Sequence, residues 1–124
     1  MSYDGFDLTG KTAVITGGNS GIGLGFARAV AAAGADVSIW GTNADKNAVA
    51  EAELQAINPS ASAIMCDVSS EEQVEESMAA VIERYGRIDA CFPNAGVSSN
   101  NDKPFYEHSN EDWFSVIDVN LHGV

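Results

Sequence analysis

Residues 12–23 read Thr-Ala-Val-Ile-Thr-Gly-Gly-Asn-Ser-Gly-Ile-Gly, and this stretch decides the fold of the chain. Its apolar front, Ala13-Val14-Ile15, is short and partly β-branched, which predicts a strand buried on both faces of a parallel sheet. Glycines follow at once, and residues 24–30 then have the spacing of an amphipathic helix. The stretch therefore predicts a strand, a tight glycine-rich turn and a helix in direct succession.

The glycine-rich turn predicts a binding site for an anionic phosphate. Backbone N–H groups and the positive end of the helix point at such an anion, and the missing side chains let it come close. Glycines alone fit a plain turn equally well, so the strand before them and the helix after them carry the prediction. The residues expected to form this part of the site are Gly17, Asn19, Ser20, Gly21, Ile22 and Gly23.

Composition limits the classes of protein that fit. The chain has 124 residues, of which 45% are hydrophobic, and this is typical of one globular domain. A formal net charge of −12 argues against nucleic acid or an anionic membrane as a partner, since both attract basic surfaces. No apolar run approaches the roughly 18 residues that span a bilayer, and the start is too acidic for a signal peptide, so we expect a cytoplasmic protein. Neither cysteine has the paired spacing of a metal site, and no metal is expected.

Turn and cap residues predict the remaining elements. Further strands are expected at residues 36–40, 61–66 and 88–92. Further helices are expected at residues 44–57, with Asn43 or Thr42 as the cap, and after Ser109. Another helix is expected between them, opened by Ser69 and Ser70 with Glu72 and Gln73 as capping-box partners and ended by Gly86. The apolar residues expected on helical stripes are Ile22, Phe26, Val30, Val49, Leu54, Ile57, Val74, Met78, Val81, Ile82 and Tyr85.

Strand and helix alternate along the chain, which predicts an α/β fold with a doubly wound, Rossmann-type parallel sheet. Right-handed crossovers give the strand order 3-2-1-4. In that order the strands that hold Cys66 and Cys91 lie about 14 Å apart at ~4.8 Å per strand, too far for a disulfide. Ligands bind beyond the carboxyl ends of such strands. The candidates there are Gly41, Thr42, Asn43, Asp67, Val68, Asn94, Ala95 and Gly96.

The Thr-Gly-x-x-x-Gly-x-Gly spacing of residues 16–23 resembles that of the short-chain dehydrogenase/reductase family. Two later motifs resemble the family as well: Pro93-Asn94-Ala95-Gly96 is similar to its Asn-Asn-Ala-Gly, and residues 119–123 are similar to the segment with its catalytic asparagine. The resemblance implies a homo-oligomeric oxidoreductase that moves a hydride between NAD(P) and a small carbonyl or alcohol substrate. It also implies that Asn94 binds backbone at the sheet centre and that Asp67 and Val68 contact adenine. From the residues alone, Asp67 could simply start a turn.

Asn120 is the one catalytic candidate in the chain. It shares a helical stripe with Trp113, Ile117 and Val124, so we expect its amide to be buried and to need hydrogen-bond partners. The resemblance implies a catalytic tetrad with a serine, a tyrosine and a lysine, in which the backbone carbonyl of Asn120 positions a water for proton relay. The alternative is an amide that only ties the helix to neighbouring backbone.

The choice between NAD and NADP is expected at Gly41-Thr42-Asn43, about 20 residues past the glycines. No carboxylate there would repel the 2′-phosphate of NADP, and no arginine there would hold it. The sequence thus favours NADP slightly and leaves NAD open.

No tyrosine in the chain is followed by a lysine four residues later. The resemblance therefore covers the cofactor-binding half: we expect residues 1–124 to be a single Rossmann-type domain that stops before the C-terminal strands and is inactive alone. The alternative is a non-catalytic nucleotide-binding or regulatory module of the same fold. A serine and then Tyr-x-x-x-Lys in the continuing reading frame would decide for the enzyme.

Overall fold

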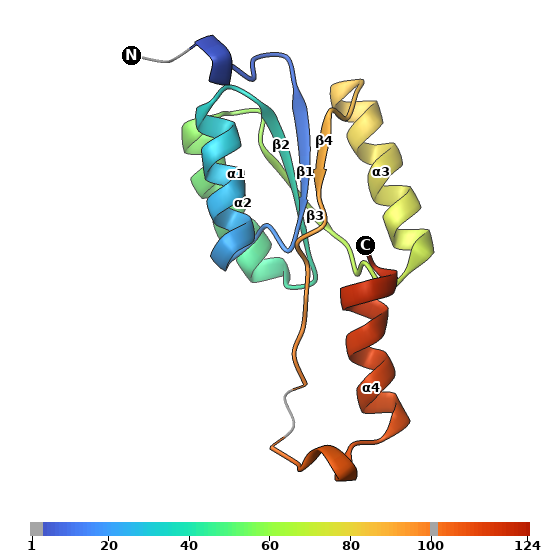
Figure 1. Ribbon diagram of the computed structural model, residues 1–124. Helices are drawn as coiled ribbons and strands as arrows, with labels where there is room; N and C mark the ends of the chain where they lie inside the picture. Colours follow the sequence, from blue (N-terminus) through green and yellow to red (C-terminus); the bar gives the residue numbers. More distant parts are fainter. Residues whose placement is uncertain (1–3, 100–101) are drawn as a thin grey trace.

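The computed structural model of the chain describes residues 4–99 and 102–124. Four parallel strands form its sheet in the order β3-β2-β1-β4, as the sequence predicted (Figure 1). Their bounds are Thr12–Thr16 for β1, Asp36–Gly41 for β2, Ser62–Met65 for β3 and Ala90–Phe92 for β4. All five residues of β1 are buried, as expected for a central strand that is covered on both faces.

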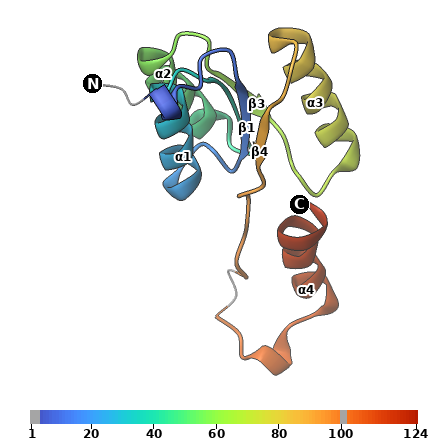
Figure 2. The same cartoon turned by 45° about the horizontal axis from the view of Figure 1, so that its top comes forward.

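Helices cover both faces of the sheet, so the fold is doubly wound. Helices α1 (Gly21–Ala32) and α2 (Ala44–Ile57) lie on one face, and α3 (Glu71–Tyr85) lies on the other (Figure 1). Helix α4 (Asn110–Ile117) continues into a π-helical turn, η3 (Asp118–His122), and both lie beyond one end of the sheet (Figures 1 and 2). Two short 3₁₀ turns, η1 (Asp4–Phe6) and η2 (Phe105–Glu107), complete the elements. None of the helices in the described ranges is long and apolar enough to cross a membrane.

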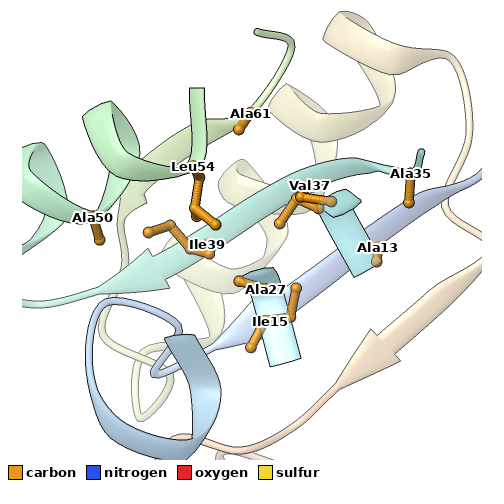
Figure 3. Packing of buried hydrophobic residues seen from close by; sticks show 10 residues of the cluster. Ala13, Ile15, Ala27, Ala35, Val37, Ile39, Ala50, Leu54 and Ala61 are labelled. Carbon is orange, nitrogen blue, oxygen red and sulfur yellow. The ribbon is translucent and has the colours of Figure 1, made fainter. Parts of the chain in front are cut away.

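The core has one layer on each face of the sheet. Ile15, Val37 and Ile39 point to the α1/α2 face and pack with Ala27 and Leu54 (Figure 3). Because successive residues of a strand point to opposite faces, their neighbours form the second layer. That layer joins Val14 and Trp40 to Val81 of α3.

The buried face of α1 differs from the predicted stripe. Gly23, Ala27 and Ala31 face the sheet, whereas Ile22 is 73% exposed and Phe26 is 41% exposed. Small residues on the buried face let the helix backbone come close to the sheet, and this holds the start of α1 against the end of β1. The prediction that Ile22 and Phe26 are core residues is therefore wrong.

Helix α2 also buries smaller residues than predicted. Its buried positions are Asn47, Ala50 and Leu54, while Val49 is 71% exposed and Ile57 is 43% exposed. Of the predicted α2 stripe, only Leu54 lies in the core. The burial of a polar residue, Asn47, places an amide beside the ends of β2 and β3, where the candidate site lies.

One predicted helix cap is confirmed and one predicted capping box does not form. Asn43, one of the two caps predicted for α2, caps the helix, and its Oδ1 accepts a 2.9 Å bond from the backbone N of Lys46. Ser70 caps α3, but Gln73 does not complete the predicted capping box, because its Oε1 accepts from the backbone N of Asp67 at 2.9 Å. The side chain of Gln73 thus braces the turn after β3 instead of the helix end.

The two cysteines are free, as the strand order predicted. Cys66 is buried at the end of β3, and Cys91 is exposed in β4, which forms one edge of the sheet. Burial raises the pKa of the Cys66 thiol, so the thiol is neutral near pH 7.

Candidate functional site

One cavity of about 490 Å³ opens at the carboxyl ends of the four strands. Its lining includes every predicted cofactor-binding residue except Gly21: Gly17, Asn19, Ser20, Ile22, Gly23, Gly41, Thr42, Asn43, Asp67, Val68, Asn94, Ala95 and Gly96. Trp40, Lys46, Cys66, Val97 and Val119 complete the lining. The structure thus brings five separate sequence segments to one cavity of the size that small-molecule sites usually have, roughly 300–1,000 Å³.

The glycine turn between β1 and α1 needs its glycines for backbone shape and for close contact. Gly17 has φ 64° and Gly21 has φ 53°, both in the left-handed region that side chains disfavour. A Cβ on Gly23 would lie 2.2 Å from the carbonyl O of Gly17 and 2.5 Å from Nδ2 of Asn94. No atom lies within 4 Å of a Cβ built on Gly21, so that position faces open space. The turn therefore keeps α1 tight against β1 and leaves its outer side open.

Thr16 and Asn94 fasten the end of β1 to the end of β4. The side-chain Nδ2 of Asn94 donates to the carbonyl oxygens of Thr16 at 3.0 Å and Gly17 at 3.3 Å. In return, Thr16 Oγ1 accepts from the backbone N–H groups of Asn94 and Ala95, each at 3.0 Å. These bonds confirm that Asn94 binds backbone at the sheet centre. Pro93, which replaces the family's first asparagine, does not prevent them.

Lys46 is the functional candidate that sequence reasoning missed. It stands in the first turn of α2 and lines the cavity beside Thr42 and Asn43. Lys46 and Asp67 are the charged residues in the lining of this cavity. Residues 41–43, directly after β2, hold no cation. Residues three apart on a helix are neighbours, however, so α2 places Lys46 next to its own cap, Asn43.

Asp67 has the local contacts of a turn residue. Its Oδ1 accepts from the backbone N of Ser69 at 2.9 Å and from the Ser69 hydroxyl at 2.6 Å. Asp67 and Val68 also line the cavity, so the contact with adenine stays a prediction beside the turn role. In the described part of the chain, no group of three or more His, Cys, Asp or Glu side chains is placed to hold a metal ion.

Asn120 is exposed, and its predicted burial in an apolar stripe is wrong. The last helix lies beyond the sheet, and its stripe is open as well: Trp113 is 57% exposed and Val124 is 73% exposed. Both polar atoms of the Asn120 amide are nevertheless hydrogen-bonded: Oδ1 accepts from Val97 N at 2.8 Å, and Nδ2 donates to Val97 O at 2.9 Å. The tie to neighbouring backbone that the residues alone suggested is therefore present, and the catalytic role stays a prediction.

Comparisons with known proteins found a matching family model and related sequences. A family model described as short chain dehydrogenase covers residues 11–124. A probable NADP-dependent mannitol dehydrogenase from Yarrowia lipolytica is 36% identical over 118 residues, which are 95% of this chain and 42% of that protein.

Two solved structures resemble this fold with different nucleotides bound. The crystal structure of NAD⁺-bound xylitol dehydrogenase has a TM-score of 0.86 and 30% identity, over 94% of this chain and 44% of its own. A metagenomic short-chain oxidoreductase in complex with NADP has a TM-score of 0.87 and 31% identity, over 94% of this chain and 52% of its own. The chain spans about half the length of the relatives that it matches.

Proposed function

The chain belongs to the short-chain dehydrogenase/reductase family, and from this premise we propose that it is the cofactor-binding part of an NAD(P)-dependent oxidoreductase. The bound nicotinamide would give a hydride to a carbonyl carbon of a small substrate or take one from an alcohol carbon. The observation that carries the proposal is the cavity in which the glycine turn meets the ends of all four strands.

The residues present fit a dinucleotide. The open outer side of the turn at Gly21, together with the start of α1, suits a pyrophosphate, which needs backbone N–H groups and free space. Asp67 and Val68 would hold the adenine end, and Asn94, Ala95 and Gly96 would border the nicotinamide ribose. In this arrangement the chain's residues bind and orient the cofactor.

We propose NADP as the preferred cofactor, because Lys46 supplies the cation that residues 41–43 lack. A Lys46→Ala variant should bind NADPH about tenfold more weakly, since a charge-assisted hydrogen bond contributes about 1.5–3 kcal/mol. NADH has no 2′-phosphate, so its affinity should stay within about twofold. Fluorescence titration of both nucleotides measures this difference.

Lys11 offers a matched control for Lys46. Its ammonium lies 3.8 Å from the carboxylate of Asp89, at the opposite end of the sheet from the cavity. A Lys11→Ala variant removes the same charge from the chain but should leave both affinities unchanged. Tighter binding of NADH than of NADPH by the unaltered chain would contradict the proposed preference, and so would equal losses in the Lys46→Ala variant.

The role proposed for Asn120 belongs to its backbone carbonyl. Two hydrogen bonds to Val97 occupy the side-chain amide, so the amide would hold the segment in place while the carbonyl positions a water. The rival proposal is a non-catalytic nucleotide-binding or regulatory module. Sequencing of the reading frame beyond Val124 separates the two: a serine and then Tyr-x-x-x-Lys would support the enzyme, and their absence would support the module.

We also propose that the protein is a cytoplasmic homo-oligomer. Free thiols at Cys66 and Cys91 fit a reducing compartment. Trp113 and Phe114 of α4 are 57% and 54% exposed, and exposed aromatic side chains favour association. Light scattering of the purified protein would measure the oligomeric state.

A further inference from the structure

A buried side-chain amide joins the glycine turn to the sheet. Asn47 of α2 is 5% exposed, and its Nδ2 donates to the carbonyl O of Gly41 at 3.0 Å and of Ile64 at 3.3 Å. Its Oδ1 accepts a 2.7 Å bond from Nδ2 of Asn19 in the glycine turn. One side chain therefore connects the turn with the ends of β2 and β3, and all of its polar atoms are satisfied.

The side-chain amides of Asn19 and Asn47 pack closely against the backbone of Gly41. A Cβ built on Gly41 would lie 2.2 Å from Asn19 Nδ2 and 2.6 Å from Asn47 Oδ1. The two amides thus meet directly over the backbone of Gly41. Because the Asn19 Nδ2 atom is turned inward by this bond, its Oδ1 is left on the side of Ser20, whose hydroxyl lies 3.4 Å away.

Asn47 does not line the cavity, but the residues that it holds do. Asn19, Gly41 and the preceding residue, Lys46, are all part of the lining. The amide therefore links the first turn of α2, which carries Lys46, to the glycine turn. This unit has no local signature in the sequence, because Asn19 and Gly41 lie 28 and 6 residues from Asn47 in the chain.

We propose that Asn47 is a positioning residue that sets the spacing between the glycine turn and Lys46, and that this spacing favours a dinucleotide with a 2′-phosphate. The inference rests on the proposed function. It predicts that loss of the amide weakens binding of a 2′-phosphorylated nucleotide more than binding of its unphosphorylated counterpart. A purely structural role would lower stability and leave this ratio unchanged.

The test compares Asn47→Ala with Asn58→Ala in the 124-residue chain. Asn58 is the matched control, because its Nδ2 donates to the carbonyl O of Ala35 at 2.8 Å, at the end of α2 that lies away from the cavity. Both variants lose an amide-to-backbone hydrogen bond, and urea unfolding should show lower stability for both. Asn47→Ala should weaken NADPH binding about tenfold and NADH binding about threefold at most, as expected when one well-placed contact is lost. Asn58→Ala should leave both dissociation constants within about twofold.

A second variant keeps the test decisive if Asn47→Ala does not fold. Asn19→Ala breaks the same bond from the partly exposed side and should change the NADPH to NADH ratio in the same direction. If both single variants fold, the double variant should be no worse than either one, because residues that act as a unit are not additive. Amide hydrogen exchange should also quicken at residues 17–23 in Asn47→Ala and not in Asn58→Ala.

The outcomes separate this inference from the proposed function. Equal losses of NADPH and NADH affinity in Asn47→Ala and Asn19→Ala would overturn the inference. Variants that unfold at lower urea concentration but bind both nucleotides as tightly as the unaltered chain would also overturn it. In both cases the proposed function would stand. If the unaltered chain bound neither nucleotide at millimolar concentration, the proposed function would fall, and the inference with it.

Discussion

Replacement of Gly23 by alanine tests the contact that holds the glycine turn together. The new Cβ would lie 2.2 Å from the carbonyl O of Gly17 and 2.5 Å from Asn94 Nδ2. Both neighbours belong to the joint between β1 and β4, so neither is the free end of a flexible side chain. To accept the methyl group, α1 must move away from the sheet and the Asn94 contact must stretch.

The expected cost follows from these contacts. Overpacking of a tight site costs about 1–3 kcal/mol, and a strained hydrogen bond adds about 1 kcal/mol. Alanine regains up to about 1 kcal/mol over glycine within a helix. The net loss for Gly23→Ala is therefore about 2 kcal/mol, and nucleotide affinity should fall as well, because the turn lines the cavity.

Gly25 supplies the control on the same helix. No atom lies within 4 Å of a Cβ built there, so Gly25→Ala should raise stability by up to about 1 kcal/mol. Urea unfolding measures both variants. With an m-value of about 2 kcal/mol/M, Gly23→Ala should lower the midpoint by about 1 M, and Gly25→Ala should not lower it. If Gly23→Ala were as stable as Gly25→Ala, the argument from close backbone contact would be refuted.

Three further predictions concern other parts of the chain. The pKa of Asp89 is lowered from its ordinary value of 3.8 by the hydrogen bond from Arg87 and by the backbone N–H of Thr12. The charged Asp89 therefore stabilises the fold above about pH 3.8, and this stability is lost as the pH falls through the lower folded-state pKa. Asp89→Asn should thus lower stability at pH 7 and flatten its decline in acid, and an unchanged urea midpoint at pH 7 would count against this. Cys91 should react with a thiol reagent well before the buried Cys66, and NADPH should slow only the reaction of Cys66, which lines the cavity. Mass spectrometry of the modified chain measures the order of reaction, and faster modification of Cys66 would contradict this prediction. In an enzyme that contains Tyr-x-x-x-Lys, Asn120→Leu keeps the backbone carbonyl but loses the two bonds to Val97 that hold it in place, so turnover should fall by about 10²- to 10⁴-fold with little change in cofactor affinity. A loss of stability alone would leave only the tie to neighbouring backbone.

The sheet and the glycine turn could be predicted from the sequence because their signals are local. The run Ala13-Val14-Ile15 has the length and branching of a buried strand, and the glycines mark the turn that follows. Alternation of strands and helices then determined the strand order, since crossovers have one hand. The same reasoning placed the site, because the ends of parallel strands meet at one edge of the sheet.

The errors arose where packing decides between equally apolar or equally polar residues. In α1, hydrophobicity favours Ile22 and Phe26 for the core, but the close approach of helix and sheet selects Ala27 and Ala31. Phe26 instead packs beside Phe92, with ring centroids 5.4 Å apart. Neither the periodicity of apolar residues nor their helix propensity determines how closely a helix approaches a sheet. A sequence pattern therefore cannot predict which residues of α1 face the sheet.

Lys46 and Asn120 show the same limit at the site. Lys46 reaches the cavity because the first turn of α2 brings it over Asn43, a relation that a linear search directly after β2 overlooks. Asn120 shares a stripe with apolar residues, but its helix packs beyond the sheet, so the stripe is exposed. The sequence indicated the two regions that contain Lys46 and Asn120. Only the three-dimensional arrangement showed which residues these side chains lie beside.

The central claim is that a dinucleotide binds in the cavity at the carboxyl ends of the strands. Titration of the isotope-labelled chain with NADPH, followed by the chemical shifts of its backbone amides, tests this claim most directly. We predict the largest shifts at residues 17–23, 41–47 and 94–97, and none at residues 10–12 and 87–89 at the opposite end of the sheet. No shifts at millimolar NADPH, or shifts centred on residues 87–89, would contradict the claim.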